Sequence, residues 1–380
     1  MDKTYRHLEK RISPADAHCF FGYFDKCPWN SRGEHPGHRV AFAGRQPRFG
    51  EAAEVGIVHD GKFEKRGETR AWCWQQGAML QWFNDEILIW NDVEGDHHVA
   101  RLSNGTVFRR PVYTLSADRH YALSLNFSRL DTERPGYGYP GIPDMSQEYA
   151  YPDFDGITLM DLQSGRNTLI VSLDRLVHEF PAYGCELGVN WVNHLLFSPD
   201  GKRISFIHRW RRFNPANHGA RYYETRLFTA NRDGSDLWML PVDFHASHYT
   251  WFSPDKMIVF SRLPNGGNQY RIYTVGNNCP EIFAPGRLPS DGHCSFSPDG
   301  KLLLTDSYPN KKNIRELVLY NPARDIRYSL GRYDSPPVLP PARCDLHPRW
   351  SADGRKISFD SFHEKFRGIY TIDLPEEILT

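Results

Sequence analysis

The chain has no long hydrophobic run, and this absence excludes a membrane-spanning helix. No apolar stretch approaches the roughly 20 residues that are needed to cross a bilayer. The chain also has no excess of either charge, because Lys plus Arg and Asp plus Glu both total 46 among 380 residues. A surface that wraps a polyanion is therefore not indicated, although a local basic pocket is compatible with zero net charge. We expect neither a nucleic-acid nor a membrane partner.

Cysteine is scarce, which bears on stability and location. The seven cysteines are scattered and odd in number, and this argues against a disulfide framework. The first residues, MDKTYRHLEKRIS, lack the apolar core of a signal peptide. We expect the chain as given to be cytoplasmic, or periplasmic or secreted if a leader has been removed.

Four near-copies of one short pattern are present. They are NHLLFSPDGKRISFIHRW at 193–210, HYTWFSPDKMIVFSRL at 248–263, GHCSFSPDGKLLLTDSY at 292–308 and HPRWSADGRKISFDSF at 347–362. Each predicts a strand, a tight turn and a second strand. In the turn Pro presets φ, Asp bonds back to its own backbone and Gly takes the position with φ > 0. Repeated hairpins of this kind are typical of a β-propeller.

Weaker hairpins upstream extend the count to seven. The strand-end anchors are Trp29, Phe83, Leu115, Phe197, Phe252, Phe296 and Trp350. Seven units in 380 residues give about 54 residues each, close to the roughly 40–50 of a four-stranded blade. We predict one all-β domain over 1–380, a seven-bladed propeller of four-stranded antiparallel blades. The segment at 367–374 is expected to be the third strand of the last blade, and the segment from Tyr5 to Ile12 its fourth, which closes the ring.

Polar side chains recur at one rim of the predicted ring. In a four-stranded blade the first strand begins on the face where the second strand ends, so these positions converge. His194, His293 and His347 each stand three residues before an anchor, and Tyr249 has the matching offset in its blade. The predicted catalytic residues are His194, His208, Arg209 and Tyr249. The predicted substrate-binding residues are Arg221, Tyr223, His248, Arg262 and Tyr308.

Two long connections, 127–155 and 209–221, open on the same rim, and long loops of this kind are usually functional. A bland explanation exists for each feature. The loops can be surface excursions, and a histidine repeated in successive blades can be a scaffold device that bonds a neighbouring blade.

A metal site is also predicted. Cys344 and His347 are three residues apart, and His293 takes the equivalent position in the adjacent blade. One thiol and two imidazoles suit zinc or another borderline transition metal. Cys294 is expected to face away from His293, because neighbours on a strand point to opposite sides.

These motifs resemble those of the propeller-type polysaccharide lyases, a group that includes oligogalacturonate lyases and ulvan lyases. The resemblance lies in NHLLFSPDG, IHRW, DGHCSFSPDG, TDSYP and CDLHPRWS between about 190 and 373, and in FFGYFDKCPW at 20–29. It implies a divalent metal held by a His cluster and a Gln, with His293 and His347 on two of those positions. The chain departs at Arg349, where another His is expected, and at Cys344, near the Gln. This difference favours zinc over manganese.

The resemblance implies β-elimination on a uronate-containing polysaccharide or oligosaccharide, with no organic cofactor. That chemistry needs a cation beside the carboxylate, a base for the C5 proton and an acid for the departing O4. Arg209 or Arg221, His194 or His208, and Tyr249 or Tyr223 are the candidates for these roles. Two alternatives stay open, namely a non-catalytic propeller that binds a glycan or protein, and a glycoside hydrolase with paired carboxylates at Asp306 and Asp360.

Overall fold

The Ser-x-Asp turns fold as hairpins for the expected physical reason. The computed structural model describes residues 2–379 except 212–222, 244, 264–265 and 337–341. The hydroxyl of Ser198 donates to Asp200 Oδ1 at 2.7 Å, and the same bond joins Ser351 to Asp353 at 2.6 Å. Gly201 closes its turn at φ 67°. Each turn is thereby fixed by local bonds, and the flanking apolar runs pair as antiparallel strands.

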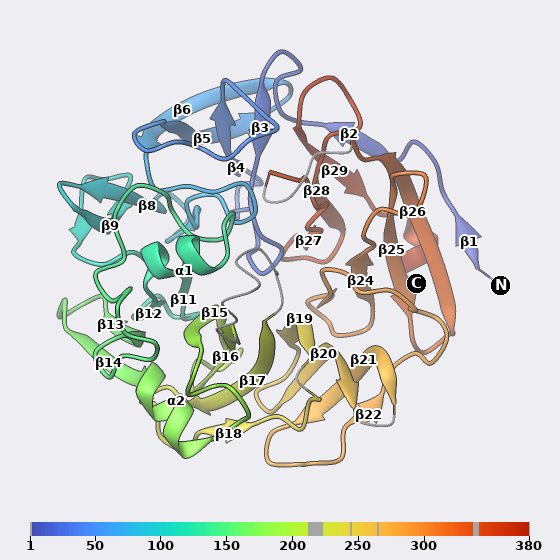
Figure 1. Cartoon of the computed structure of the whole chain (residues 1–380). Helices are drawn as coiled ribbons and strands as arrows, with labels where there is room; N and C mark the ends of the chain where they lie inside the picture. Colours follow the sequence, from blue (N-terminus) through green and yellow to red (C-terminus); the bar gives the residue numbers. More distant parts are fainter. Residues whose placement is uncertain (1, 212–222, 244, 264–265, 337–341, 380) are drawn as a thin grey trace.

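The strands form seven sheets around a central axis (Figure 1). Blade one contains β3 (His18–Phe20), β4 (His35–Val40), β5 (Ala53–His59) and β6 (Lys62–Thr69). Blade two contains β7 (Gln81–Trp82), β8 (Leu88–Glu94), β9 (His97–Leu102) and β10 (Val107–Phe108). Blade three contains β11 (Thr114–Leu115), β12 (Tyr121–Ser124), β13 (Gly156–Asp161) and β14 (Asn167–Ser172). Blade four contains β15 (Val189–Phe197), β16 (Arg203–Arg211), β17 (Glu224–Asn231) and β18 (Trp238–Met239).

Blade five contains β19 (Ala246–Trp251), β20 (Lys256–Leu263), β21 (Gly267–Thr274) and β22 (Glu281–Ile282). Blade six contains β23 (Ser295–Phe296), β24 (Leu303–Asp306), β25 (Ile314–Asn321) and β26 (Ile326–Asp334), and blade seven contains β27 (Arg349–Trp350), β28 (Lys356–Ser361) and β29 (Gly368–Asp373). The helices in the described part are α1 (Phe127–Glu133), α2 (Leu173–Glu179) and α3 (Glu376–Leu379), and none of them is long and apolar enough to cross a membrane. The predicted seven-bladed, all-β fold is confirmed.

The N-terminal segment closes the ring. β2 (Glu9–Arg11) pairs antiparallel with β29 as the fourth strand of blade seven, with Glu9 opposite Ile372. This closure was expected. β1 (Lys3–Thr4) was not, and it pairs parallel with β26 as a fifth strand of blade six. The first dozen residues therefore connect two blades.

The first blade differs from the prediction. Its innermost strand is β3, so Trp29 is not a strand-end anchor and lies in the connection between β3 and β4. This connection reaches the centre of the ring (Figure 1). Gly22 has φ 136°, and a Cβ there would lie 2.8 Å from the Gln76 carbonyl oxygen, so the chain can turn inward at this point only with glycine. The connection brings Tyr23 and Phe24 among residues of the other blades.

The apolar core lies between blades rather than in one central mass. One cluster joins Leu123 and Ile157 of blade three to Leu195 and Phe206 of blade four. A second joins blade six to blade seven. Since each blade buries its faces only against its neighbours, the core is continuous only when the ring is closed.

Removal of residues 2–12 should lower the thermal midpoint by about 5 °C or more. It deletes β2 and the Arg11 side chain, which donates to Glu364 at 2.7 Å, to the Phe366 carbonyl oxygen at 3.0 Å and to the Tyr370 hydroxyl at 3.1 Å. Removal of residues 2–4 alone, which deletes only β1, is the control and should cost less. Thermal unfolding of both variants tests this, and equal midpoints would contradict the closing role of β2.

Candidate active site

Four histidines from blades four to seven meet beside the inward connection of blade one. His194 and His248 lie in the innermost strands β15 and β19, and His293 and His347 each stand two residues before the first residue of β23 and β27. The ring centroids of His248 and His293 are 4.0 Å apart, and those of His293 and His347 are 4.2 Å apart. The Tyr23 ring lies 5.0 Å from His194 and 4.9 Å from His347. We call these four imidazoles the histidine cluster.

Two members of the cluster present unpartnered nitrogen atoms. His293 Nδ1 bonds to Asp306 at 2.9 Å, and His347 Nδ1 donates to the Gly22 carbonyl oxygen at 2.9 Å. Within the described residues, neither Nε2 has a hydrogen-bond partner, although both are buried. A buried imidazole whose Nδ1 proton is held by an oxygen has its Nε2 lone pair free for a metal.

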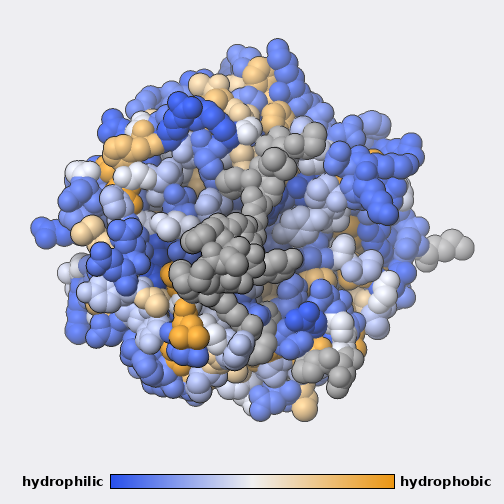
Figure 2. Space-filling view, in the orientation of Figure 1, coloured by the Kyte–Doolittle hydropathy of each residue, from blue (hydrophilic) through white to orange (hydrophobic). Residues whose placement is uncertain are grey.

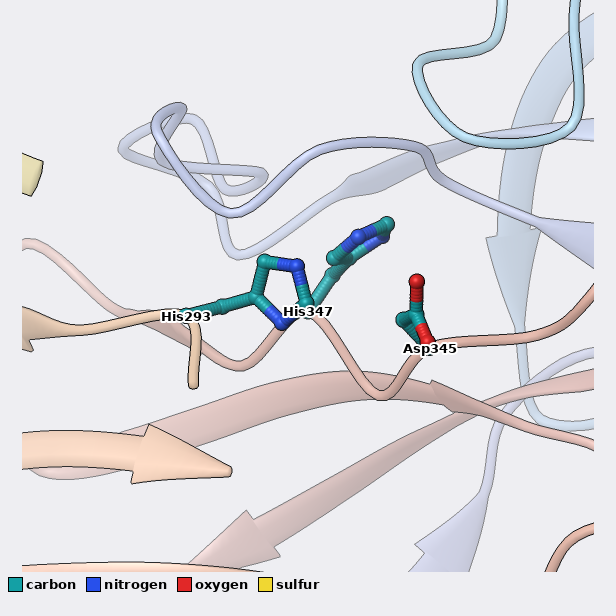
Figure 3. A group of neighbouring side chains, drawn as sticks. All are labelled: His293, Asp345 and His347. Atoms are coloured by element: carbon teal, nitrogen blue, oxygen red, sulfur yellow. The ribbon is translucent and has the colours of Figure 1, made fainter. Parts of the chain in front are cut away.

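The third candidate ligand is Asp345. Ligand atoms of His293, Asp345 and His347 all lie within 4.8 Å of one another, and Figure 3 shows the His347 ring between the other two side chains in this view. Arg343 Nε lies 2.8 Å from one oxygen of Asp345 and Arg315 Nη1 2.8 Å from the other. Burial raises the pKa of Asp345, but the two guanidiniums have the larger combined effect and lower the pKa to about 2. The carboxylate is therefore ionised, as a metal ligand must be.

Cys344 is not part of this group. Its sulfur contacts the Asp345 carbonyl oxygen at 3.7 Å, and burial raises the pKa of the thiol to about 11. Within the described residues the group of neighbouring ligand atoms consists of the two histidines and Asp345, without the Cys344 sulfur. The predicted set of His293, Cys344 and His347 is thus not brought together; the carboxylate of Asp345 takes the place of the thiol. The prediction of zinc rested on that thiol, and the donor set does not favour zinc over manganese.

Arg349, at the position where the resemblance calls for another histidine, faces the inward connection. It donates to the Gly22 carbonyl oxygen at 2.7 Å and to the Tyr23 carbonyl oxygen at 3.1 Å. Asp360 pairs with it at 3.2 Å. Arg349 therefore holds the segment that positions Tyr23, and its guanidinium is engaged by these structural partners.

Three arginines, Arg134, Arg209 and Arg343, gather beside the histidine cluster, and we call them the arginine group. Arg134 lies 4.2 Å from the Tyr137 ring centroid and donates to the Tyr223 hydroxyl at 2.9 Å. Arg209 lies 5.0 Å from the Tyr223 ring, and Arg343 donates to the Tyr137 hydroxyl at 3.2 Å. The Tyr137 ring is 5.8 Å from His194, which connects the arginine group to the histidine cluster.

The arginines change the acidity of the groups around them. Burial raises the pKa of Tyr223, but the charges of Arg134 and Arg209 outweigh it and hold that pKa below its ordinary value. Burial, and then Arg209 and Arg134, hold the pKa of His194 well below its ordinary value. At neutral pH the site therefore combines a neutral imidazole with a phenol that loses its proton more readily than usual.

His208 lies elsewhere. Its Nε2 bonds to Asn190 Oδ1 at 2.8 Å, and Arg226 Nη2 lies 3.0 Å from its Nδ1. Both ring nitrogens are thus used inside blade four. His208 and Arg209 are neighbours on β16 and face opposite ways, so only Arg209 reaches the site. The structure does not bring His208 to His194.

The remaining predicted residues divide. Tyr308 lies near the cluster, 6.1 Å from His248 and 6.2 Å from His293 between ring centroids. The Tyr249 hydroxyl donates to the backbone carbonyl of His194, so Tyr249 fixes that residue. Arg262 pairs with Asp243 at 3.0 Å, and no contact among the described residues joins it to the cluster. Arg221 lies outside the described residues.

Sequence reasoning missed five residues of the site: Tyr23, Arg134, Tyr137, Arg343 and Asp345. Signals for most of them were present. Tyr23 lies in FFGYFDKCPW, Arg134 and Tyr137 lie in the long connection 127–155, and Asp345 lies in CDLHPRWS, two residues before His347. Arg343 had no signal, because it comes from the irregular segment before β27.

The fold is similar to that of several solved proteins. An oligogalacturonate lyase in complex with manganese superimposes with a TM-score of 0.65 at 14% identity, covering 98% of this chain and 94% of that one. An oligogalacturonate lyase from Vibrio parahaemolyticus gives 0.62 at 14%, covering 97% and 94%. A puromycin-hydrolyzing peptidase from Mycobacterium tuberculosis gives 0.53 at 12%, covering 94% and 53%. No family model and no curated protein matches the sequence. Identities this low show a shared propeller fold, which hosts several chemistries.

Proposed function

We propose that the protein is a polysaccharide lyase that cleaves a uronate-containing glycan by β-elimination. The observation that carries this proposal is the arginine group, in which Arg134 and Arg209 contact Tyr223 close to the neutral imidazole of His194. Cations beside a phenol and an imidazole are the set that uronate elimination requires. The likeness in fold to two oligogalacturonate lyases over nearly the whole chain supports the same reading.

Each step then has a residue. The uronate carboxylate would pair with Arg209 and Arg134, because planar guanidiniums match its geometry. This pairing would neutralise the negative charge of the carboxylate attached to C5. His194 would take the C5 proton, and the electron pair of that C–H bond would form the C4=C5 double bond. The C4–O4 bond breaks in consequence, and the Tyr223 phenol would protonate O4.

A divalent metal fits beside this centre. His293, Asp345 and His347 would hold it, because two unpartnered Nε2 atoms and an ionised carboxylate are suitable donors. When bound, it would supply further positive charge to an anionic substrate. One of the similar structures is a manganese complex, and a manganese ion is compatible with these ligands.

The carboxylates proposed for a hydrolase are occupied. Asp306 accepts from His293 Nδ1 and from the His347 backbone amide, and Asp360 pairs with Arg349 and Arg367. Neither has the open neighbourhood that an acid or base acting on water requires. The contacts therefore favour elimination over hydrolysis.

Incubation with a panel of uronate glycans tests the proposal. We expect a new ultraviolet absorbance from the C4=C5 double bond on at least one of them, oligogalacturonates first. New reducing ends without that absorbance would indicate hydrolysis instead. Unchanged glycans throughout would return the chain to the class of non-catalytic binding propellers.

A further inference from the structure

A concave site lies on the same face as the candidate active site, between blades two and three. It is a groove of about 760 Å³. The end of β8, the start of β9, the segment 109–111, the start of α1 and part of the 142–156 segment line it. Second strands end on the face where first strands begin, so the ends of β8 and β12 place the groove on the face of the histidine cluster. None of the residues proposed to act in catalysis lines it.

Two arginines without partners among the described residues line the groove. Arg109 and Arg110 are both exposed, and in the described part of the chain neither side chain has an ion pair or hydrogen bond. Of the acids there, Glu94 pairs with Arg101 at 3.3 Å, Asp96 contacts the imidazole of His97 at 3.2 Å, and Asp155 accepts from the neutral amide of Asn126 at 2.8 Å. Two uncommitted guanidiniums in one groove are suited to carboxylates.

Apolar side chains complete the surface. Phe154 is 57% exposed and Met145 is 87% exposed, and both line the groove. Figure 2 shows separate hydrophobic spots on a face that is otherwise largely hydrophilic. An exposed aromatic face beside free cations suits a sugar ring that carries a carboxylate, because the ring presents one apolar side and the carboxylate one charge.

Helix α1 connects the groove to the candidate active site. Phe127 at its start lines the groove, and Arg134 directly after its end belongs to the arginine group. Seven residues at ~1.5 Å each separate the two points by about 10 Å. This separation is within the length of an extended saccharide of a few units.

We propose that this groove is a distal binding site for an acidic oligosaccharide, in which Arg109 and Arg110 pair with carboxylates of units beyond the one that reacts. This inference rests on the proposed function for the identity of the ligand. The groove makes the protein select longer chains, because each added uronate brings a further charge-assisted hydrogen bond within reach of a guanidinium.

Binding measured apart from cleavage tests the groove. Hexagalacturonate and trigalacturonate are titrated calorimetrically into the Tyr223→Phe protein and into the same protein with Arg109→Ala and Arg110→Ala. We expect the dissociation constant for hexagalacturonate to rise about tenfold in the second protein and that for trigalacturonate to change less. The control is the double variant Lys202→Ala and Lys301→Ala. These lysines lie in equivalent turns of blades four and six, at the end of each blade that is away from the groove. The control removes the same number of positive charges and should leave both dissociation constants unchanged.

The outcomes separate this inference from the proposed function. Two results would contradict the proposed binding site, whatever the double-bond absorbance shows. One is an unchanged dissociation constant for hexagalacturonate in the Arg109 and Arg110 variant. The other is an equal loss of affinity in the lysine control. Arginine-dependent binding without any double-bond formation by the unmodified protein would instead retain the groove as an acidic-glycan site and remove the lyase. Thermal midpoints of all variants establish that they are folded.

Discussion

Replacing Tyr223 by phenylalanine should lower the rate of elimination by roughly 10²–10⁴ while leaving the thermal midpoint in place. The change removes only the hydroxyl that Arg134 contacts at 2.9 Å and keeps the ring against Arg209. It should also change the pH profile. Because the phenol must be protonated to act as an acid, activity falls as pH rises through its pKa, which the arginines hold below the ordinary value. In the variant this alkaline limb should disappear.

Tyr121→Phe is the matched control for Tyr223→Phe. Tyr121 also lies beside a guanidinium, with Arg232 4.1 Å from its ring, but it begins β12 at the opposite end of blade three. Its loss should leave turnover and the alkaline limb in place. If Tyr223→Phe kept full turnover with a lowered midpoint, the hydroxyl would be structural and the assignment of the acid would be wrong.

His347→Ala should weaken the binding of a divalent metal by about 10²-fold or more, and His293→Ala should do the same. Each removes a buried Nε2 atom that has no partner in the described part of the chain. Titration of metal-free protein with manganese and with zinc measures the effect. The expected stoichiometry is about one ion per chain for the unmodified protein.

Cys344→Ser distinguishes the two candidate ligand sets. It should leave metal binding unchanged, since the hydrogen bond of the sulfur goes to the Asp345 carbonyl oxygen and the sulfur does not belong to the ligand group found among the described residues. A loss as large as that in His347→Ala would restore the thiol as a ligand and contradict the set of His293, Asp345 and His347. Full binding in both histidine variants would place the ion elsewhere.

The fold was largely predictable because its signal is local and repeated. The proline of the Ser-Pro-Asp-Gly turn fixes φ, and the hydrogen bonds of the turn join residues that are close in the sequence. Each copy of the motif therefore predicts one hairpin. Blade one has no such turn between its first two strands. Its strand-end anchor was therefore predicted from an aromatic residue alone, Trp29, and this prediction was wrong. The strand actually lies at His18–Phe20, where only three residues pair and the following connection leaves the blade.

The site was predictable only in part, because it combines regular and irregular segments. His194, His248, His293 and His347 recur at one blade position, and a repeat exposes such residues. Side-chain alternation along β16 separates His208 from Arg209. No such rule selects Asp345 over Cys344, because this segment is not a strand and His347 has φ 45°. Arg134 and Arg343 reach the site from irregular connections, whose direction depends on packing that one sequence does not report.

The pairing of β1 with blade six and of β2 with blade seven has a consequence for how the chain acquires its fold. Glu9 of β2 pairs with Ile372 of β29, so the two strands of this pair are more than three hundred residues apart in the sequence. At roughly 5–20 residues per second, synthesis separates the two by about 20 to 70 s. During that interval the first strands have no partner and the blades form an open arc with two unpaired edges. Closure is therefore the most non-local event in folding, and we expect it to set the pace of refolding.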